Sequence, residues 1–197
     1  NHSGKLTAGT MEISGDFTQS SSKTSNNFAA SGSHKVTFTS DKKHIVSISS
    51  ASSSYSYFNK LDITGAEIEL KYDTYLKNEL IGEDGVITGK TIVICNNAKV
   101  PSVINGNVEI YGNYTLAKDV QIKGSLYLHG SQFNLSGYTL TVDGNTTSYE
   151  STINLNKGTY NSNGDFTIGR YSRLNIVNPE ETLNVQGKFS FSNPYDY

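Results

Sequence analysis

The feature that most constrains the fold of this sequence is a short phrase that recurs at nearly constant spacing. The phrase is Gly-x-φ-x-φ, in which φ is usually apolar, and its glycines are Gly106, Gly124, Gly144, Gly164 and Gly187. The steps between these glycines are 18, 20, 20 and 23 residues. A nearly fixed period of this size is typical of solenoid proteins, in which each repeat buries its apolar face against the next.

Each period carries about three short segments in which apolar and polar residues alternate. One segment precedes the glycine, as in Leu140-Thr-Val142-Asp-Gly144, another follows it, and a third lies between, as in Ile153-Asn-Leu155. Alternation with a period of two places one side chain inside and the next outside a strand. Such segments are too short to form a β-sandwich. If equivalent segments of successive periods stack, however, their apolar side chains form buried columns.

We therefore expect an all-β chain folded as a right-handed parallel β-solenoid (β-helix), with roughly 20 residues per coil. At that coil length the 197 residues make roughly ten coils. The glycine at each corner is expected to supply the positive φ that a sharp turn needs.

The N-terminal half repeats the same pattern less regularly, for example in Met11-Glu-Ile13-Ser-Gly15-Asp-Phe17. We predict a single β-solenoid domain over residues 1–197, with less regular coils over 1–100 and regular coils over 101–197. Polar loops are expected near 20–27 and 49–56, and a helical turn is acceptable only over 72–78.

One coil departs from the pattern, because the inward positions after Gly144 are the polar residues Thr146 and Ser148. Two interpretations are open: the coil bends locally there, or its strand begins later, at Ile153.

The two ends of the sequence resemble each other. Leu183-Asn-Val185-Gln-Gly187-Lys-Phe189 reads like the phrase around Gly15, and joining Tyr197 to Asn1 would place Gly187 and Gly15 25 residues apart. Solenoids need covered ends, and neither terminus shows a charged or helical cap. The chain also begins without Met or a signal peptide, which predicts that it is processed or cut from something larger. We therefore expect a segment of a longer repeat protein or filament, or end-to-end association with identical copies.

The composition is polar but weakly charged. Ser, Thr and Asn number 26, 19 and 20, whereas the net charge is only −2. This balance gives no reason to expect a nucleic-acid partner, and no apolar run approaches the length of a membrane span, so we expect no membrane insertion. A chain rich in Ser, Thr, Asn and Tyr with a single cysteine is common among exported bacterial proteins, which favours an extracellular or cell-surface location.

Two stretches carry a resemblance to a known group of proteins. Leu6-Thr-Ala-Gly-Thr-Met-Glu-Ile-Ser-Gly-Asp-Phe17-Thr-Gln resembles a phrase in very large secreted surface proteins of Gram-positive anaerobic bacteria. So does Gly32-Ser-His-Lys-Val36-Thr-Phe-Thr, followed by Phe58-Asn-Lys-Leu-Asp-Ile63. In those proteins similar phrases recur in tandem along β-solenoid stalks. The resemblance implies an extracellular structural or adhesive repeat and transfers no catalytic or binding residue.

Parallel β-helices also include polysaccharide-degrading enzymes, whose sites need clustered acidic residues with Lys or Arg. The only arginines here are Arg170 and Arg173, and the candidate aspartates Asp16, Asp143 and Asp165 are isolated in the sequence. Asp16 and Asp165 follow corner glycines, where a short acceptor can satisfy backbone amides. Glu150 and the Glu180-Glu181 pair are expected to be solvated corners. We therefore predict no enzymatic activity and no catalytic residue.

Metal and thiol chemistry has equally little support. The histidines His2, His34, His44 and His129 lack metal-ligand spacing, and the run that ends at His44 reads as a charged turn. Cys95 ends an apolar run and is expected to be a buried, inert thiol. No metal or cofactor is predicted.

Outward-facing columns offer one alternative function. The first column should contain Glu109, Tyr127, Thr147, Thr167 and Ser190, and the next should begin with Tyr111 and His129. Faces rich in Tyr and Asn can bind glycans, although Tyr and Thr also favour strands by propensity alone. The sequence therefore predicts a stiff stalk or filament subunit first. A carbohydrate-binding adhesin module is the alternative, followed by a polysaccharide-degrading β-helix enzyme.

Overall fold

The computed structural model describes residues 4–20 and 27–192. Within these ranges it contains strands and turns but no helix, and the strand pairs of each unit are parallel. The fold is a parallel β-solenoid with about 20 residues per turn; for example, Leu126 pairs with Thr146 in the next coil. The predicted all-β solenoid is confirmed. The right-handedness of the coil, the expected number of roughly ten coils and the single-domain organisation stay predictions.

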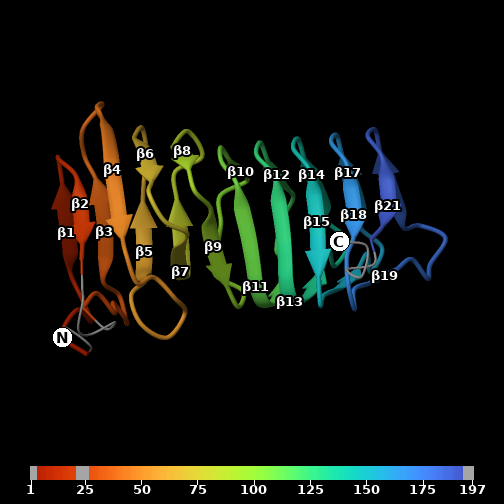
Figure 1. Cartoon of the computed structure of the whole chain (residues 1–197), viewed down its shortest axis with the longest axis horizontal. Helices are drawn as coiled ribbons and strands as arrows, with labels where there is room; N and C mark the ends of the chain where they lie inside the picture. The colour runs from red at the N-terminus through yellow and green to blue at the C-terminus, as the bar shows by residue number, and fades with distance from the viewer. Residues whose placement is uncertain (1–3, 21–26, 193–197) are drawn as a thin grey trace. The chain divides into compact units, whose positions relative to one another are not determined.

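The chain divides into two compact units, Asn1–Gly106 (unit 1) and Asn107–Tyr197 (unit 2). Figure 1 shows the strands of each unit lying side by side, with the turns of the coils at the ends of the strands. The strands of unit 1 are β1 (Thr10–Ile13), β2 (Phe17–Gln19), β3 (Lys35–Phe38), β4 (Lys43–Ile48), β5 (Phe58–Asp62), β6 (Glu67–Leu70), β7 (Thr74–Ile81), β8 (Val86–Gly89), β9 (Ile92–Cys95) and β10 (Val103–Ile104).

Each coil of unit 1 has three segments. In the coil of β7, a first segment, 74–76, pairs with β9, a second segment, 79–81, pairs with 60–62 of β5, and β8 is the third segment. Residues 60–62 in turn pair with β3, and β3 pairs with β1. Strands β1 and β3 are therefore second segments, whereas β2 and β4 belong to the third column, which β6 and β8 continue.

Unit 2 has the same three-segment coil. Its strands are β11 (Val108–Thr115), β12 (Val120–Ile122), β13 (Leu126–Asn134), β14 (Thr139–Val142), β15 (Thr146–Tyr149), β16 (Thr152–Asn154), β17 (Thr159–Ser162), β18 (Phe166–Ile168), β19 (Arg173–Asn175), β20 (Thr182–Val185) and β21 (Phe189–Phe191). The first column runs through β13, β15, β18 and β21, the second through β13, β16 and β19, and the third through β12, β14, β17 and β20.

The alternation predicted from the sequence describes the core. In β4 and β14, for example, buried side chains alternate with more exposed ones. The apolar columns include Val36 over Leu61 in unit 1 and Leu140 over Tyr160 in unit 2, and all four side chains are at least 99% buried. Loss of this apolar surface from water is the main stabilising contribution, as in other solenoids.

The corner glycines of unit 2 act differently from the prediction. Gly144, Gly164 and Gly187 do not have positive φ. A Cβ on Gly164 would lie 2.6 Å from the carbonyl oxygen of Gly144, and one on Gly187 would lie 2.7 Å from that of Gly164. These residues are therefore glycine because successive corners stack backbone on backbone. Gly65 of unit 1, at φ +67°, does fit the original expectation.

The polar coil at Gly144 follows neither of the two predicted interpretations. Strand β15 runs from Thr146 to Tyr149, and both Thr146 and Ser148 point inward and are fully buried. Thr146 Oγ1 lies 2.9 Å from the hydroxyl of Tyr160, which is itself fully buried and belongs to the third segment of the same coil. The core accepts Thr146 because it hydrogen-bonds to Tyr160 across the coil, whereas Ser148 Oγ donates to the carbonyl oxygen of Thr167 in the next coil at 3.5 Å. Burial also raises the pKa of the Tyr160 hydroxyl well above its usual range.

The helical turn that the sequence allowed over 72–78 does not form, because β7 begins at Thr74. The similar end phrases also lie at different corners. Gly15 joins a second segment, β1, to a third, β2, whereas Gly187 joins a third segment, β20, to a first, β21. The 25-residue spacing between these glycines therefore does not compare equivalent positions.

Of the two predicted polar loops, only the one over 49–56 is fully described by the structure. Most of the loop near 20–27 lies outside the described residues. The loop over 49–56 connects β4 to β5 and is held by its own hydrogen bonds, with the Ser52 amide donating to the Ser56 carbonyl at 3.2 Å.

Candidate functional site: the terminal coil of unit 2

The terminal coil of unit 2 consists of β19, β20 and β21, the last described strand of each of its three columns. Its inward side chains continue the buried columns of the preceding coil. Phe189 pairs with Phe166 and Phe191 with Ile168. Phe166 and Ile168 are 0% and 3% exposed, whereas Phe189 and Phe191 are 41% and 75% exposed. Among the described residues, these two core positions of the terminal coil are therefore not buried.

The open surface extends over the second and third segments. Ile176 and Val177, which follow β19, are 46% and 77% exposed. Leu174, Leu183 and Val185 are only half buried. An apolar surface that follows three strand edges is unusual for a solvated face, because each edge also carries backbone groups able to pair with another strand.

A buried carboxylate shapes the corner between β19 and β20. Glu181 is 8% exposed and accepts hydrogen bonds from the backbone amides of Val177, Asn178 and Lys157 and from the Asn178 side chain. The hydrogen bond from the Asn178 side chain and those from the backbone amides lower the pKa of Glu181 to about 2. The prediction of a solvated corner is thus wrong for Glu181. It holds for Glu180, whose side chain is 65% exposed and lies 3.9 Å from Lys157.

Asparagine ladders line the outer surface of these coils. Asn175 donates from Nδ2 to Oδ1 of Asn154 at 2.7 Å, and Asn154 donates in the same way to Asn134 at 2.8 Å. A parallel bond joins Asn184 to Asn161 at 2.8 Å. Each step has the same direction, so the terminal Asn175 and Asn184 turn their amide oxygens away from the preceding coil. The ladders fix the register between coils and end at the same open coil.

The predicted outward columns are confirmed. Glu109, Tyr127, Thr147, Thr167 and Ser190 align in register, and Tyr111, His129 and Tyr149 form the next column.

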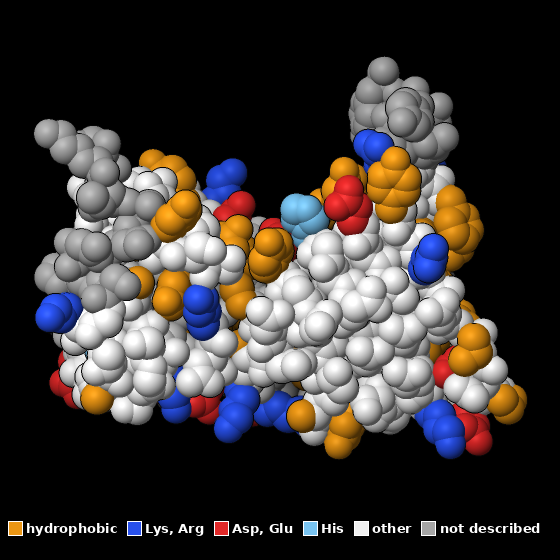
Figure 2. Space-filling view, turned by 90° about the horizontal axis from the view of Figure 1, so that it is seen from below, with side chains coloured by type: hydrophobic (Ala, Val, Ile, Leu, Met, Phe, Trp, Pro, Cys, Tyr) orange, Lys and Arg blue, Asp and Glu red, His pale blue; other side chains and the backbone are white. Residues whose placement is uncertain are grey.

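His129 lies at the centre of an aromatic group on this surface. Its Nδ1 is 3.5 Å from the Glu109 carboxylate, and its ring centroid lies 5.6–6.1 Å from those of Tyr111, Tyr127 and Tyr149. Burial, and then the nearby charge of Glu109, raise the pKa of Tyr127. Figure 2 shows a face on which uncharged polar side chains and backbone predominate, with one small group in which a histidine lies beside acidic and hydrophobic side chains.

The three candidate aspartates accept hydrogen bonds from neighbouring coils. Asp16 accepts from the amide of Ile45 at 2.7 Å, and Asp165 accepts from that of Lys188 at 2.8 Å. Asp143 accepts from the Asn163 side chain and the Gln121 side chain at 2.8 and 2.9 Å. The acceptor role is as predicted, but the donors belong to neighbouring coils, so sequence-local turn reasoning could not identify them.

The two candidate arginines do not act together on one group. Arg170 donates to the hydroxyl of Tyr171 at 2.7 Å and lies over the same ring, whereas Arg173 is exposed on the outer side of β19. Glu150, exposed as predicted, has positive φ at the corner between β15 and β16.

The remaining histidines and the cysteine have structural positions. His44 belongs to β4 rather than to an exposed charged turn. It is 1% exposed, with Nδ1 2.6 Å from the Gly15 carbonyl oxygen and Nε2 3.2 Å from that of Ser40. His34 is also buried, which lowers its pKa. Cys95 is buried at the end of β9, as predicted, and His2 lies outside the described residues.

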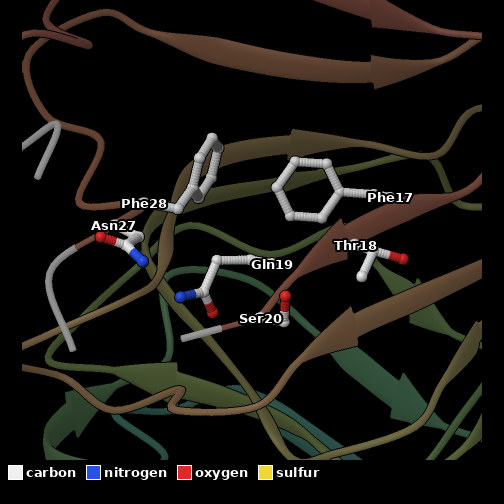
Figure 3. Close-up of a pocket in the computed structure, with 6 residues that line it drawn as sticks. All are labelled: Phe17, Thr18, Gln19, Ser20, Asn27 and Phe28. Carbon is white, nitrogen blue, oxygen red and sulfur yellow. The ribbon is translucent and has the colours of Figure 1, made fainter. Parts of the chain in front are cut away.

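A hollow of about 460 Å³ lies in unit 1. It is lined by Phe17, Thr18, Gln19, Ser20, Asn27 and Phe28. The Gln19 side chain extends from β2 toward the Asn27–Phe28 segment, and both atoms of its amide are buried without a hydrogen-bond partner (Figure 3). Gln19 is therefore a buried polar residue whose amide has no hydrogen-bond partner among the residues that the structure describes.

No set of three or more His, Cys, Asp or Glu side chains is close enough to hold a metal ion in residues 4–20 and 27–192. The same ranges contain no helix that is long and apolar enough to cross a membrane. The chain matches no family model, and neither the curated proteins nor the solved structures include a match.

Sequence reasoning missed the residues that make the terminal coil distinctive. Phe189 and Phe191 read as ordinary core positions, and their exposure follows only from the absence of a described strand beyond β21. Ile176 occupies the inward position of Leu155, and Val177 could have been recognised as an apolar residue at a corner where the preceding coil carries Asn156.

Proposed function

We propose that this chain is an extracellular structural repeat that acts as a stiff stalk or filament subunit, stacked end to end through its β-solenoid. The proposed coils are right-handed and number roughly ten over the whole chain, as parallel crossovers and the repeat length favour. An extracellular or cell-surface location accords with the polar, weakly charged composition.

The observation that carries this proposal is the open core of the terminal coil. Burying Phe189 and Phe191 under another coil would remove apolar surface from water and pair the free edges of β19, β20 and β21. Both contributions act along the solenoid axis, so the same contacts that stabilise one coil on the next would join one subunit to the next.

Sedimentation velocity over a hundredfold range of concentration, combined with negative-stain electron microscopy, tests this function. We expect concentration-dependent association into rods, which Phe191→Asp should abolish because a carboxylate would be desolvated at the junction. Tyr55→Asp is the matched control, since Tyr55 is exposed in a loop of unit 1. A wild-type chain that stays monomeric at every concentration, or a Phe191→Asp variant that assembles normally, would overturn the proposal.

The aromatic group around His129 favours a second function, carbohydrate binding as an adhesin module. Tyr111 is 40% exposed and His129 has a 41% exposed side chain, so ring faces and polar groups are available together. Sugars bind such surfaces by stacking and hydrogen bonding. Glycan arrays and pull-down with insoluble polysaccharides should give signals that Tyr111→Ala reduces and Tyr72→Ala does not. If the wild-type chain binds none of the glycans or polysaccharides, this function is excluded for the glycans tested.

A further inference from the structure

The geometry points to one specific head-to-tail junction, in which β1 of one copy pairs with β19 of the next and Glu12 forms an ion pair with Arg173 across the junction. This inference rests on the proposed end-to-end association and deepens it by naming the strands, their register and the charges that meet. The occupant of the open terminal coil is a second copy of this chain.

The first argument is the order of segments at the two ends. The described strands of unit 1 begin with a second segment, β1, continue with a third, β2, and reach a first segment at Ala29, which bridges to Tyr57. The open edges of the terminal coil are also a second, a third and a first segment, namely β19, β20 and β21. At each end of a solenoid, the outermost segments belong to two successive coils, so the end surface is offset by one coil at one corner. At both ends of this chain, the offset lies between a first and a second segment. The strand edges at the two ends therefore follow the same order around the coil, so that β1, β2 and the segment at Ala29 can meet β19, β20 and β21 in turn.

The second argument fixes the register of the junction. Second segments carry two inward residues two positions apart, such as Ile153 and Leu155, which are both 0% exposed. Leu174 lies over Ile153, and Ile176 follows it at the position equivalent to Leu155.

In unit 1, Met11 and Ile13 occupy the same two positions over Val36 and Phe38. Equivalent positions align when Met11 lies on Leu174 and Ile13 lies on Ile176. Ile13, which is only half buried, would then cover a side chain that is 46% exposed.

The third argument is charge complementarity. In this register Arg173 pairs with Thr10, so Glu12 lies two residues further along the neighbouring strand. Unit 1 already contains this diagonal arrangement. Lys35 pairs in register with Lys60, and its Nζ lies 3.0 Å from the Asp62 carboxylate, two residues further along.

Arg173 and Glu12 are both exposed. The guanidinium of Arg173 can also donate to the amide oxygen of Asn175, at the end of its ladder. The arginine would thus donate to two acceptors, the Glu12 carboxylate and the Asn175 amide oxygen, which would otherwise face each other without a donor.

Charge exchange tests the junction. Glu12→Arg and Arg173→Glu should each weaken association about threefold to tenfold in sedimentation velocity, because each places like charges together across every junction. An equimolar mixture of the two variants should recover association. Its copies can alternate so that the two substituted side chains, which have opposite charges, meet at one junction and the native pair meets at the next. The double variant should recover association as well.

Lys123→Glu is the matched control, because Lys123 is exposed at an internal corner of unit 2. Circular dichroism confirms that each variant is folded. If the wild type associates but the single variants are unaffected, or their mixture shows no recovery, this junction is overturned while end-to-end assembly stands. If the wild type does not associate at all, the proposed function and this inference fail together.

Discussion

At the scale of single residues, two chemically different uses of glycine produce the same sequence phrase. Gly65 turns the chain with positive φ, whereas Gly164 has an ordinary φ and is required because the corner above it is too close for a Cβ. Sequence spacing locates both kinds of corner but does not distinguish them. The distinction matters for mutation, because a side chain at a stacked glycine such as Gly164 would collide with the backbone of the neighbouring coil, whereas one at Gly65 would not.

Gly164→Ala is expected to destabilise the solenoid by about 1–3 kcal/mol, the usual cost of overpacking, because its Cβ would meet backbone atoms of Gly144. Gly15→Ala is the matched control. Gly15 is also a corner glycine, but its φ is not positive and a Cβ there meets nothing within 4 Å. Urea denaturation measures both variants. Equal destabilisation by the two would contradict the stacking explanation.

At the scale of the elements, alternation predicted where strands lie because the inside and outside of a coil differ in every period. Alternation did not predict burial where a residue's hydrogen-bond partner belongs to another segment or another coil. The polar Thr146 is accommodated because Tyr160 supplies a buried hydroxyl. Glu181 is buried because two backbone amides of its own corner and the amide of Lys157 in the preceding coil donate to it. The candidate surface was hidden for the same reason, since exposure of Phe191 depends on which strands surround β21.

The corner between β19 and β20 gives a prediction for acid stability. Because the folded pKa of Glu181 is about 2 and its ordinary value is 4.5, the unfolded chain binds the proton more readily. The stabilisation by Glu181 is therefore present above pH 4.5 and is lost as the pH falls from 4.5 toward 2. Glu181→Gln should lower the free energy of unfolding at pH 7 and flatten its pH dependence in that range.

Glu180→Gln is the control for this experiment, because the neighbouring Glu180 side chain is 65% exposed. Urea denaturation at several pH values should show a wild-type pH dependence for Glu180→Gln. A Glu181→Gln variant with the same acid dependence as the wild type would show that the carboxylate does not stabilise the corner.

At the scale of the whole molecule, a solenoid has no natural limit along its axis, because each coil offers the next the same backbone edge and the same apolar columns. What limits it is the chemistry of the terminal coils. Here the terminal coil of unit 2 keeps Phe189 and Phe191 where the preceding coil has Phe166 and Ile168. The described residues beyond β21 add no strand over them. Under the proposed end-to-end association, stability and association would be coupled through the same few side chains.

This coupling predicts that thermal stability depends on protein concentration. If folded copies associate and unfolded ones do not, a concentration one hundred times the dissociation constant stabilises the fold by about 2.7 kcal/mol. For a chain of this size that corresponds to a rise in Tm of roughly 5–10 °C. Scanning calorimetry of the wild type should show this rise, whereas Phe191→Ser should have a Tm independent of concentration. Because Phe191 is 75% exposed within one copy, its loss should hardly change the Tm of the dilute monomer. A large drop at low concentration would instead mean that Phe191 stabilises its own coil, which would remove the argument that this surface is reserved for another copy.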